Sequence, residues 1–280
     1  MSLSKACTLF SLCRQGMYQQ QRRDHRLRAD LAKVKQLVAD VRRLMPRLGT
    51  RKIYYLIRKE LARKAIKLGR DRLFGFLKRE GLLITPRKSY TKTTWSKHWM
   101  KKYPNTFKTI QLSRPEQAWV SDITYIPSRQ GIRYLSLVTD AFSHKIVGYH
   151  LSTDLRAESV AEALKMAIKS RTTFLPLLHH SDRGVQYCSF IYQQLLKNHK
   201  IEPSMTEGAQ NCYQNALAER INGIIKDEFL PEQVPNSHDI DQLIHEAVEI
   251  YNNKRPHLSL NYQTPAYFHQ LNNKKTVNVF

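Results

Sequence analysis

Three acidic residues lie at positions from which their side chains could take part in phosphoryl transfer. Asp122 interrupts the otherwise apolar run AWVSDITYI, Asp182 follows the apolar run at 175–178, and Glu219 lies in a helical segment. A charge within a buried strand is costly unless it is paired or bound to metal. Carboxylates that converge from separate elements suit Mg²⁺ or Mn²⁺. The acids predict a catalytic site with two ions, which would generate an attacking oxygen and stabilise the leaving oxygen.

The segment that contains Glu219 has helical periodicity over residues 215–230. At 100° per residue its apolar side chains share one face, while Glu219, Asn222 and Lys226 share the opposite one. Glu219 and Lys226 would then point into the same groove. An ordinary pair of surface charges explains this helix, taken alone, better than a site does. His179 and His180 adjoin Asp182 and could bind metal, although a buried supporting role suits them better.

The elements that must position these acids follow from hydrophobic patterns. Three runs rich in β-formers within 117–153 predict an antiparallel meander. Further strands are expected at 175–181 and 200–206, and helices at 157–170, 189–199, 215–230 and 237–252. Three strands followed by alternating helix and strand predict an α/β fold with a mixed sheet. Asp182 would lie at the carboxyl end of a strand, where α/β folds commonly build their sites.

Charge divides the chain into two parts. Residues 1–110 contain 29 Lys and Arg against 6 Asp and Glu, a difference of +23, whereas residues 111–280 contain 17 of each kind. The whole excess charge of +23 therefore lies in the first part. Such a block indicates binding to a phosphate backbone, with an RNA-binding segment or a solvated helix face as the alternatives. The neutral partner region favours a DNA-binding module joined to a separate functional domain.

The basic part predicts three amphipathic helices: one at 28–45, one capped by Thr50, and one capped by Asp71 and ending near Gly81. Together they indicate a helix-turn-helix module, with the third helix as the recognition helix. A purely structural three-helix bundle is the alternative. The side chains expected to contact DNA are Arg51, Lys52, Arg70, Arg72, Lys78 and Arg79.

We expect four regions: a helix-turn-helix region at 1–85, a basic linker at 86–114, a catalytic core at 115–232 and a helical carboxyl-terminal extension at 233–280. The linker is rich in basic residues and is punctuated by prolines, so it is an extended strap along DNA or a tether. Cys7, Cys13, Cys188 and Cys212 have neither zinc-site nor disulfide spacing. No membrane span or signal peptide is expected, which places the protein in the cytoplasm.

Five stretches carry a resemblance to a known family: AWVSDITYI, YLSLVTDAFSHKIVGYHLS, HHSDRGVQY, NCYQNALAERINGIIKDEF and YNNKRPHLSLNYQTPAYF. Their order resembles bacterial insertion-sequence transposases of the retroviral-integrase-like DDE superfamily. The most similar type is the second-frame product (OrfB) of the insertion sequence three family. GTRKIYYLI and DRLFGFLKREGLL resemble that family's helix-turn-helix region, so the resemblance covers nearly the whole chain.

This resemblance implies an RNase H-like core with Asp122, Asp182 and Glu219 as its catalytic and metal-binding triad. Lys226 matches a basic residue that holds DNA phosphate. Thirty-six residues separate Asp182 from Glu219, one more than is usual, and the extra residue falls near 206–210. Asp140 is expected to be structural. Residues flanking the site that could contact the DNA ends are Arg183, Tyr213 and Asn215.

The activity expected from the resemblance is metal-assisted cleavage of DNA followed by strand transfer. The partners would be terminal repeats, target DNA, further copies of the chain and an upstream-frame product as fusion or partner. Two alternatives remain. A catalytically idle DNA-binding protein or repressor would explain the charge distribution, and an RNase H-like nuclease or resolvase would share the metal chemistry.

Overall fold

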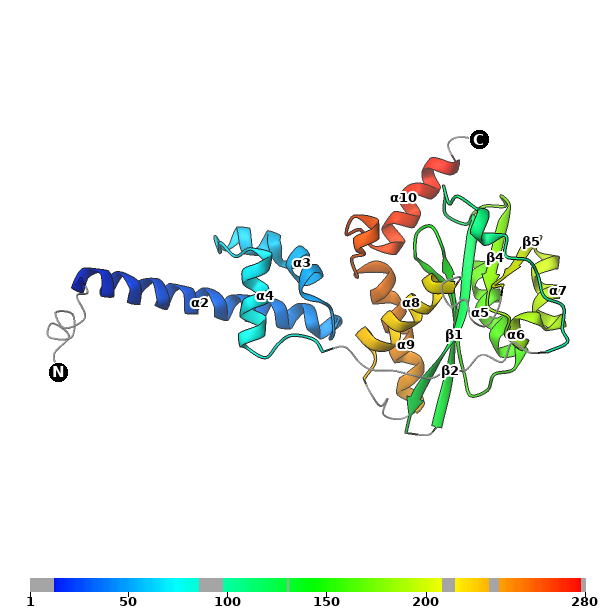
Figure 1. Ribbon diagram of the computed structural model, residues 1–280, viewed down its shortest axis with the longest axis horizontal. Coiled ribbons are helices and arrows are strands. Elements are labelled where there is room, and N and C mark those ends of the chain that lie inside the picture. The colour runs from blue at the N-terminus through cyan, green and yellow to red at the C-terminus, as the bar shows by residue number, and fades with distance from the viewer. Residues whose placement is uncertain (1–12, 86–97, 130, 208–214, 232–236, 278–280) are drawn as a thin grey trace. The chain divides into compact units, whose positions relative to one another are not determined.

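The computed structural model describes residues 13–85, 98–129, 131–207, 215–231 and 237–277, and the chain divides into two compact units. Met1–Ile84 form a helical unit, and Thr85–Phe280 form a unit built around a β-sheet (Figure 1). Within the described segments, no helix combines the length and the apolar character needed to cross a bilayer.

The first unit contains helices α2 (Arg14–Leu44), α3 (Thr50–Arg63) and α4 (Arg70–Arg79). Helix α2 begins well before the expected residue 28. Its later turns pack on α3, and α3 packs on α4. The helical periodicity of the sequence places apolar side chains on the facing sides of the helices. The buried core comprises Val34, Val38, Met45, Leu48, Ile53, Ile57, Leu61, Leu73, Phe76 and Leu77.

The prediction that Thr50 and Asp71 cap α3 and α4 was wrong. Gly49 and Gly69 occupy the two N-cap positions in extended conformation, and neither helix has a side-chain cap. Thr50 is therefore the first residue of its helix, and Asp71 lies one residue inside the next. Glycine is tolerated as an N-cap because its backbone adopts the required geometry without steric cost.

The second unit contains a five-stranded mixed sheet in the order β3-β2-β1-β4-β5. Strands β1 (Ala118–Ser128), β2 (Gly131–Asp140) and β3 (Ile146–Ser152) form an antiparallel meander. β4 (Leu177–Ser181) then pairs in parallel with β1, and β5 (Ile201–Met205) with β4. The predicted α/β class and mixed RNase H-like sheet are confirmed.

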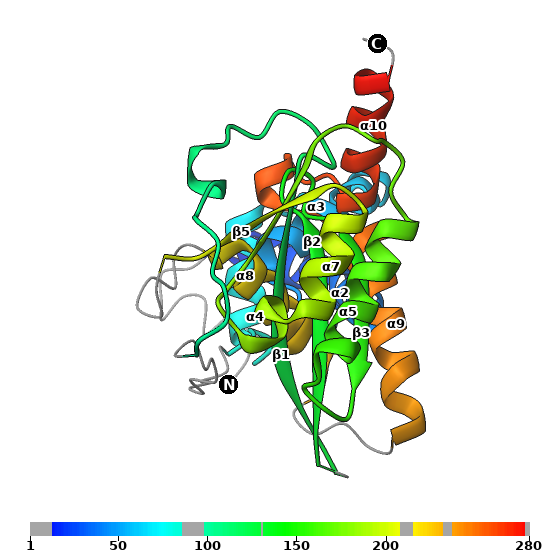
Figure 2. The same cartoon turned by 90° about the vertical axis from the view of Figure 1, so that its right-hand side faces the viewer.

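Helices cover both faces of the sheet (Figures 1 and 2). One face packs against α5 (Ala157–Lys169), α6 (Val185–Cys188) and α7 (Phe190–Asn198). The other carries α8 (Ala216–Ile224), the π-helical turn η3 (Ile225–Phe229) and α9 (Ser237–Asn253). The remaining short elements are η1 (Phe107–Thr109) and η4 (Leu258–Leu260), and α10 (Pro265–Val277) packs on α9.

Alternation along β1 decides which of its side chains reach the site. Trp119 lies in the core under α5 and α7, whereas Ala118 and Val120 lie in the core that also contains Ala218 of α8. Successive side chains of a strand point to opposite faces. Asp122 therefore points to the same face as Ala118 and Val120, the face that α8 covers.

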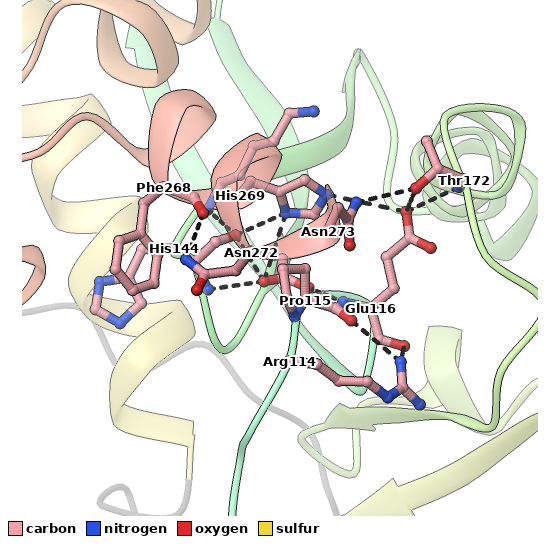
Figure 3. A network of polar contacts seen from close by, with 12 residues as sticks. Arg114, Pro115, Glu116, His144, Thr172, Phe268, His269, Asn272 and Asn273 are labelled. Atoms are coloured by element: carbon pink, nitrogen blue, oxygen red, sulfur yellow. Dashed lines mark hydrogen bonds and ion pairs between the residues drawn. The ribbon is translucent and has the colours of Figure 1, made fainter. Parts of the chain in front are cut away.

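A buried network of charges fixes the chain at the start of β1 (Figure 3). The carboxylate of Glu116 accepts hydrogen bonds from the backbone and side chains of Thr172 and Thr173. Asp140, which is fully buried, accepts from the backbone N–H of Glu116 and from Ser143. His269 of α10 lies 3.9 Å from the Glu116 carboxylate and 3.7 Å from that of Asp140. Asp140 is thus structural, as expected.

Two side chains attach the segment after α9 and the end of α9 to the rest of the second unit. The amide of Asn252 donates to the carbonyl of Ile146 at 2.9 Å and accepts from its N–H at 3.0 Å. Arg255 donates two hydrogen bonds of 2.7 Å to Glu228 of η3. Arg255 is almost fully buried, so this bidentate pair holds η3 in place.

Candidate active site

The pairing of two neighbouring strands brings Asp122 and Asp182 to the same level. β1 and β4 run in parallel, with Ala118 opposite Leu178 and Val120 opposite His180. The same offset, carried two residues further, places Asp122 level with Asp182, which directly follows β4. Adjacent strands lie about 4.8 Å apart, so the two carboxylates are neighbours. A hydrogen bond of 2.9 Å from the N–H of Gly184 to Asp182 Oδ1 fixes the second one.

Helix α8 brings Glu219 to this pair. Asn215 donates a hydrogen bond of 3.0 Å to the carbonyl of Ser121, and Asn222 donates one of 2.8 Å to Asp122 Oδ2. Glu219 lies four residues after the first and three before the second, and this spacing puts all three on one side of a helix. Glu219 therefore belongs to the stripe of α8 that faces residues 121–122.

The three acids influence one another's ionisation. Burial and the charge of Asp182 raise the pKa of Asp122 to about 7, although hydrogen bonds from Asn222 and the Ile123 N–H oppose this shift. Glu219 also contributes to the raised pKa of Asp122. Desolvation and the charge of Asp182 raise the pKa of Glu219 itself. Such mutually raised values mark a place where a cation would be stabilised.

The donor atoms at this place suit a hard divalent cation. All the charged donors are carboxylate oxygens, and two further buried oxygens beside them, Asn222 Oδ1 and Tyr187 Oη, have no hydrogen-bond partner within the described segments. Over the same segments, no three acid, histidine or cysteine side chains lie close enough to hold one ion together. The three acids are thus neighbours, but their carboxylates do not all lie close enough to bind the same ion. Residues 208–214, which lead into α8, are outside the described part.

Helix α8 and its continuation differ from the expected continuous α-helix. α8 ends at Ile224 and continues as the π-helical turn η3, which carries Lys226. The expected polar face was also wrong in part, because Asn222 is buried at 4% exposure against Asp122 rather than turned away from the sheet. Residues Ala218, Ile221, Ile225 and Phe229 form the buried side. A π-turn shifts the angular phase of every later residue, which periodicity at 100° does not anticipate.

Three residues expected to flank the site have different surroundings. Asn215 is buried and bonded to Ser121, a contact that anchors α8. Arg183 is partly buried, and its carbonyl accepts a hydrogen bond of 2.8 Å from His98 Nε2. Tyr213 lies outside the described residues. Contact of these side chains with DNA remains a prediction.

The two histidines before Asp182 support the sheet. His179 Nε2 lies within hydrogen-bond distance of the hydroxyls of Ser121 and Tyr192, and burial lowers its pKa to about 3. His180 Nδ1 bonds the hydroxyl of Ser204 at 2.9 Å. Both side chains are buried and engaged with neighbouring elements. This is the supporting role that the sequence favoured.

Sequence reasoning missed Tyr187 as a residue of the site. Its side chain is 2% exposed, and burial raises its pKa well above the usual value, with the charges of Asp122 and Asp182 contributing. The signal in the sequence was its position five residues after Asp182, inside the stretch HHSDRGVQY. Asn222 was noticed on the helix, but its bond to Asp122 needed coordinates.

The helical unit carries a separate basic surface. The starts of α3 and α4 line a hollow of about 610 Å³ together with Leu83 and Ile84. Arg51, Lys52 and Arg70 lie on its wall beside Phe74, which is half exposed. Backbone N–H groups at helix starts favour anions, and basic side chains add to this. Arg72, Lys78 and Arg79 on α4 are also exposed.

Comparisons with known proteins show which family the sequence belongs to. The integrase core domain family matches residues 113–210, and a second integrase core domain family matches 199–265. A 31 kDa protein of the insertion element IS600 from Shigella sonnei is 33% identical over 94% of this chain and 97% of its own length. The transposase for the insertion sequence element IS629 from Shigella sonnei is 31% identical over 78% of this chain and 72% of its own length.

A structural likeness accompanies these matches. The catalytic core domain of HTLV-2 integrase, solved in complex with magnesium, is 21% identical, with a TM-score of 0.45 over 56% of this chain and 97% of that one. The matches define a class of DNA recombinases with an integrase core. Within that class, this chain belongs to the bacterial insertion-sequence transposases of the DDE superfamily.

Proposed function

We propose that this chain cuts the ends of an insertion sequence and joins them to target DNA in a reaction that depends on divalent metal. The observation that carries the proposal is the parallel register of β1 and β4, by which Asp122 of β1 and Asp182, the residue after β4, lie at neighbouring positions. Glu219 is electrostatically coupled to both. Mg²⁺ or Mn²⁺, when bound, would supply an activated oxygen nucleophile and stabilise the leaving oxygen.

Each acid has a proposed role. Asp122 and Asp182 would hold one ion between them, and Glu219 would complete a second site. Asn222 keeps the Asp122 carboxylate in place through its hydrogen bond, and Gly184 does so for Asp182. Lys226 would hold a phosphate of the DNA, and the Arg255–Glu228 pair fixes the turn on which it lies.

DNA binding and catalysis would belong to different parts of the chain. We propose that residues 1–85 bind DNA through the basic surface, that 86–114 link the units, that 115–232 perform catalysis, and that 233–280 support the core. The charge difference between the two parts of the sequence supports this division. Terminal repeats and target DNA would be the substrates, several copies would assemble on DNA, and an upstream-frame product would act as fusion or partner.

The decisive experiment uses purified full-length protein with cognate element ends and Mg²⁺. We expect cleaved and joined products from the wild type and their loss in Asp182→Asn and Glu219→Gln. Glu246→Gln on the exposed side of α9 is the matched control and should retain both products. Joining by Asp182→Asn at the wild-type rate would overturn the proposal. Cleavage without any joined product would instead indicate a nuclease.

A further inference from the structure

Trp99 is an exposed aromatic side chain at an unexpected place. It is 92% exposed, and it follows directly on His98, the first residue described after 86–97. Full exposure of an indole costs the free energy that its burial would otherwise contribute, about 2–3 kcal/mol for a large apolar side chain. An isolated exposed apolar residue is unremarkable on its own. The neighbours of Trp99, however, hold the backbone beneath it in place.

Contacts on either side anchor this segment. His98 Nε2 bonds the carbonyl of Arg183 at 2.8 Å, and Lys102 Nζ donates to the carbonyl of His98 at 3.1 Å. Met100 and Tyr103 are partly buried and pack against the core beneath α5 and α7. The inward side chains thus fix the segment, and the indole of Trp99 is left facing solvent.

The anchor places the residue before Trp99 against the residue that follows Asp182. Arg183, whose carbonyl receives the bond from His98, is the residue that follows Asp182. The charges of Asp182, Lys102 and Arg183 all act on the pKa of the Cys188 thiol, which burial raises to about 11. A second basic side chain, Lys101, lies over the ring of Tyr103 at 5.1 Å.

We propose that residues 98–102 bind the DNA strand at the bond to be cut, with Trp99 stacking on an unpaired base next to the scissile phosphate. This inference rests on the proposed function. An aromatic face offers stacking to any base, and the basic side chains of Lys101 and Lys102 next to it can contact phosphates. The carboxylates repel a phosphate backbone, so an adjacent contact that is apolar and cationic offsets that repulsion.

Stacking on an unpaired base also explains why the indole lies at the edge of the site. An aromatic platform stabilises an unpaired base next to the bond that is cut, and so holds the strand at that bond in one position. Trp99 is thereby a positioning residue for the substrate strand. Stacking energies of about 1–3 kcal/mol per base correspond to about 5- to 150-fold in affinity or rate.

The test uses the full chain in EDTA, so that it requires no turnover. Element-end duplexes carry a single 5-iodouracil at successive positions flanking the cleaved bond, and crosslinked peptides are mapped after irradiation. We expect a crosslink at Trp99 at one or two adjacent positions. Phe174→Ala is the control, because Phe174 is 98% exposed elsewhere in the same unit and its removal should leave the crosslink unchanged.

A second measurement separates stacking from a structural role. Trp99→Ala should reduce joining about 10-fold on intact DNA and leave unchanged the rate on DNA that is abasic at the crosslinked position, while Trp99→Phe retains most activity. An equal loss on intact and abasic DNA would overturn the inference. The absence of any crosslink at Trp99, together with a change in the sedimentation of Trp99→Ala, would overturn the inference and assign Trp99 to a protein interface. If the crosslink forms but no DNA is ever cut, the proposed function fails and the strand contact stands.

Discussion

The carboxyl group of Asp122 lies among other acids at the middle of the sheet, where ionisation opposes folding. Its pKa in the folded chain is about 7, against an ordinary value of 3.8. Between these two pH values the folded state binds more protons than the unfolded state, so the free energy of unfolding falls as pH rises. The cost of the charge is present in full above pH 7 and absent below about pH 4.

We therefore expect Asp122→Asn to stabilise the metal-free protein at pH 8 and to abolish its activity. The gain should be about 1–3 kcal/mol, which allows for the part of the side chain that solvent screens. Urea unfolding in EDTA at pH 8 and pH 4 measures it, and the gain should be small at pH 4. Asp241→Asn on α9 serves as a surface control. Equal gains at both pH values would contradict the assigned ionisation.

Asn222 tunes the same carboxylate through its hydrogen bond. Removing the donor in Asn222→Ala should raise the pKa of Asp122 further, because that bond favours the ionised form. The rising limb of the pH–rate profile should move to higher pH, with the rate at pH 7 reduced about 10-fold. Asn198→Ala on α7 is the matched control. A loss of rate with an unmoved profile would mean that Asn222 acts only through packing.

Helix α10 is attached to the sheet by charge. Burial lowers the pKa of His269, but the nearby carboxylates of Asp140 and Glu116 outweigh burial and raise it. The same histidine and the threonines at 172–173 lower the pKa of Glu116 to about 2, although burial opposes this. Stability from His269 is thus fully present below its unfolded pKa of 6.5 and is lost as pH rises through the higher folded value.

His269→Ala should accordingly destabilise the protein more at pH 6 than at pH 9. We expect a loss of about 2–4 kcal/mol at pH 6, because two buried carboxylates lose their cationic partner. Chemical denaturation at the two pH values measures the difference. His199→Ala, at the exposed end of α7, is the control. A penalty independent of pH would show that the ring acts by packing alone.

Much of this architecture could be predicted from element-scale patterns. The bounds of the strand that contains Asp122 and of the strand that precedes Asp182 were predicted to within a few residues, because turn-forming residues border their apolar runs. The π-turn after Ile224 could not be predicted, since the buried residues Ile221, Ile225 and Phe229 keep a four-residue spacing that a continuous α-helix also shows. The Glu116–His269 contact spans most of the second unit, and no local pattern encodes so distant a pairing.

The two units have separate physical signatures at the scale of the whole molecule. The excess positive charge belongs to the first 110 residues, which comprise the first unit and the beginning of the second, and the acids lie further along the second unit. DNA binding should therefore be independent of metal and steeply dependent on salt, whereas cleavage requires metal. Asp182→Asn should bind DNA as well as the wild type does.

Removal of each basic residue of α4 that contacts a phosphate should weaken DNA binding and lower its salt dependence by a fixed amount. Arg72→Ala and Lys78→Ala should each reduce the slope of log K against log[salt] by about 1 if each contacts one phosphate. Fluorescence anisotropy with labelled duplex at several salt concentrations gives the slope. Lys169→Ala at the end of α5 is the control. Unchanged slopes for both α4 variants would place the phosphate contacts elsewhere on the basic unit.

The carboxamide of Asn252 occupies both hydrogen-bonding groups of Ile146, where the outermost strand of the meander begins. An unpaired rim of a sheet is a template on which another chain can form a further strand. At Ile146 the backbone N–H and carbonyl that would pair with such a strand are already bonded to the Asn252 side chain. A further strand could therefore not pair through the backbone of Ile146 unless the Asn252 side chain first moved away.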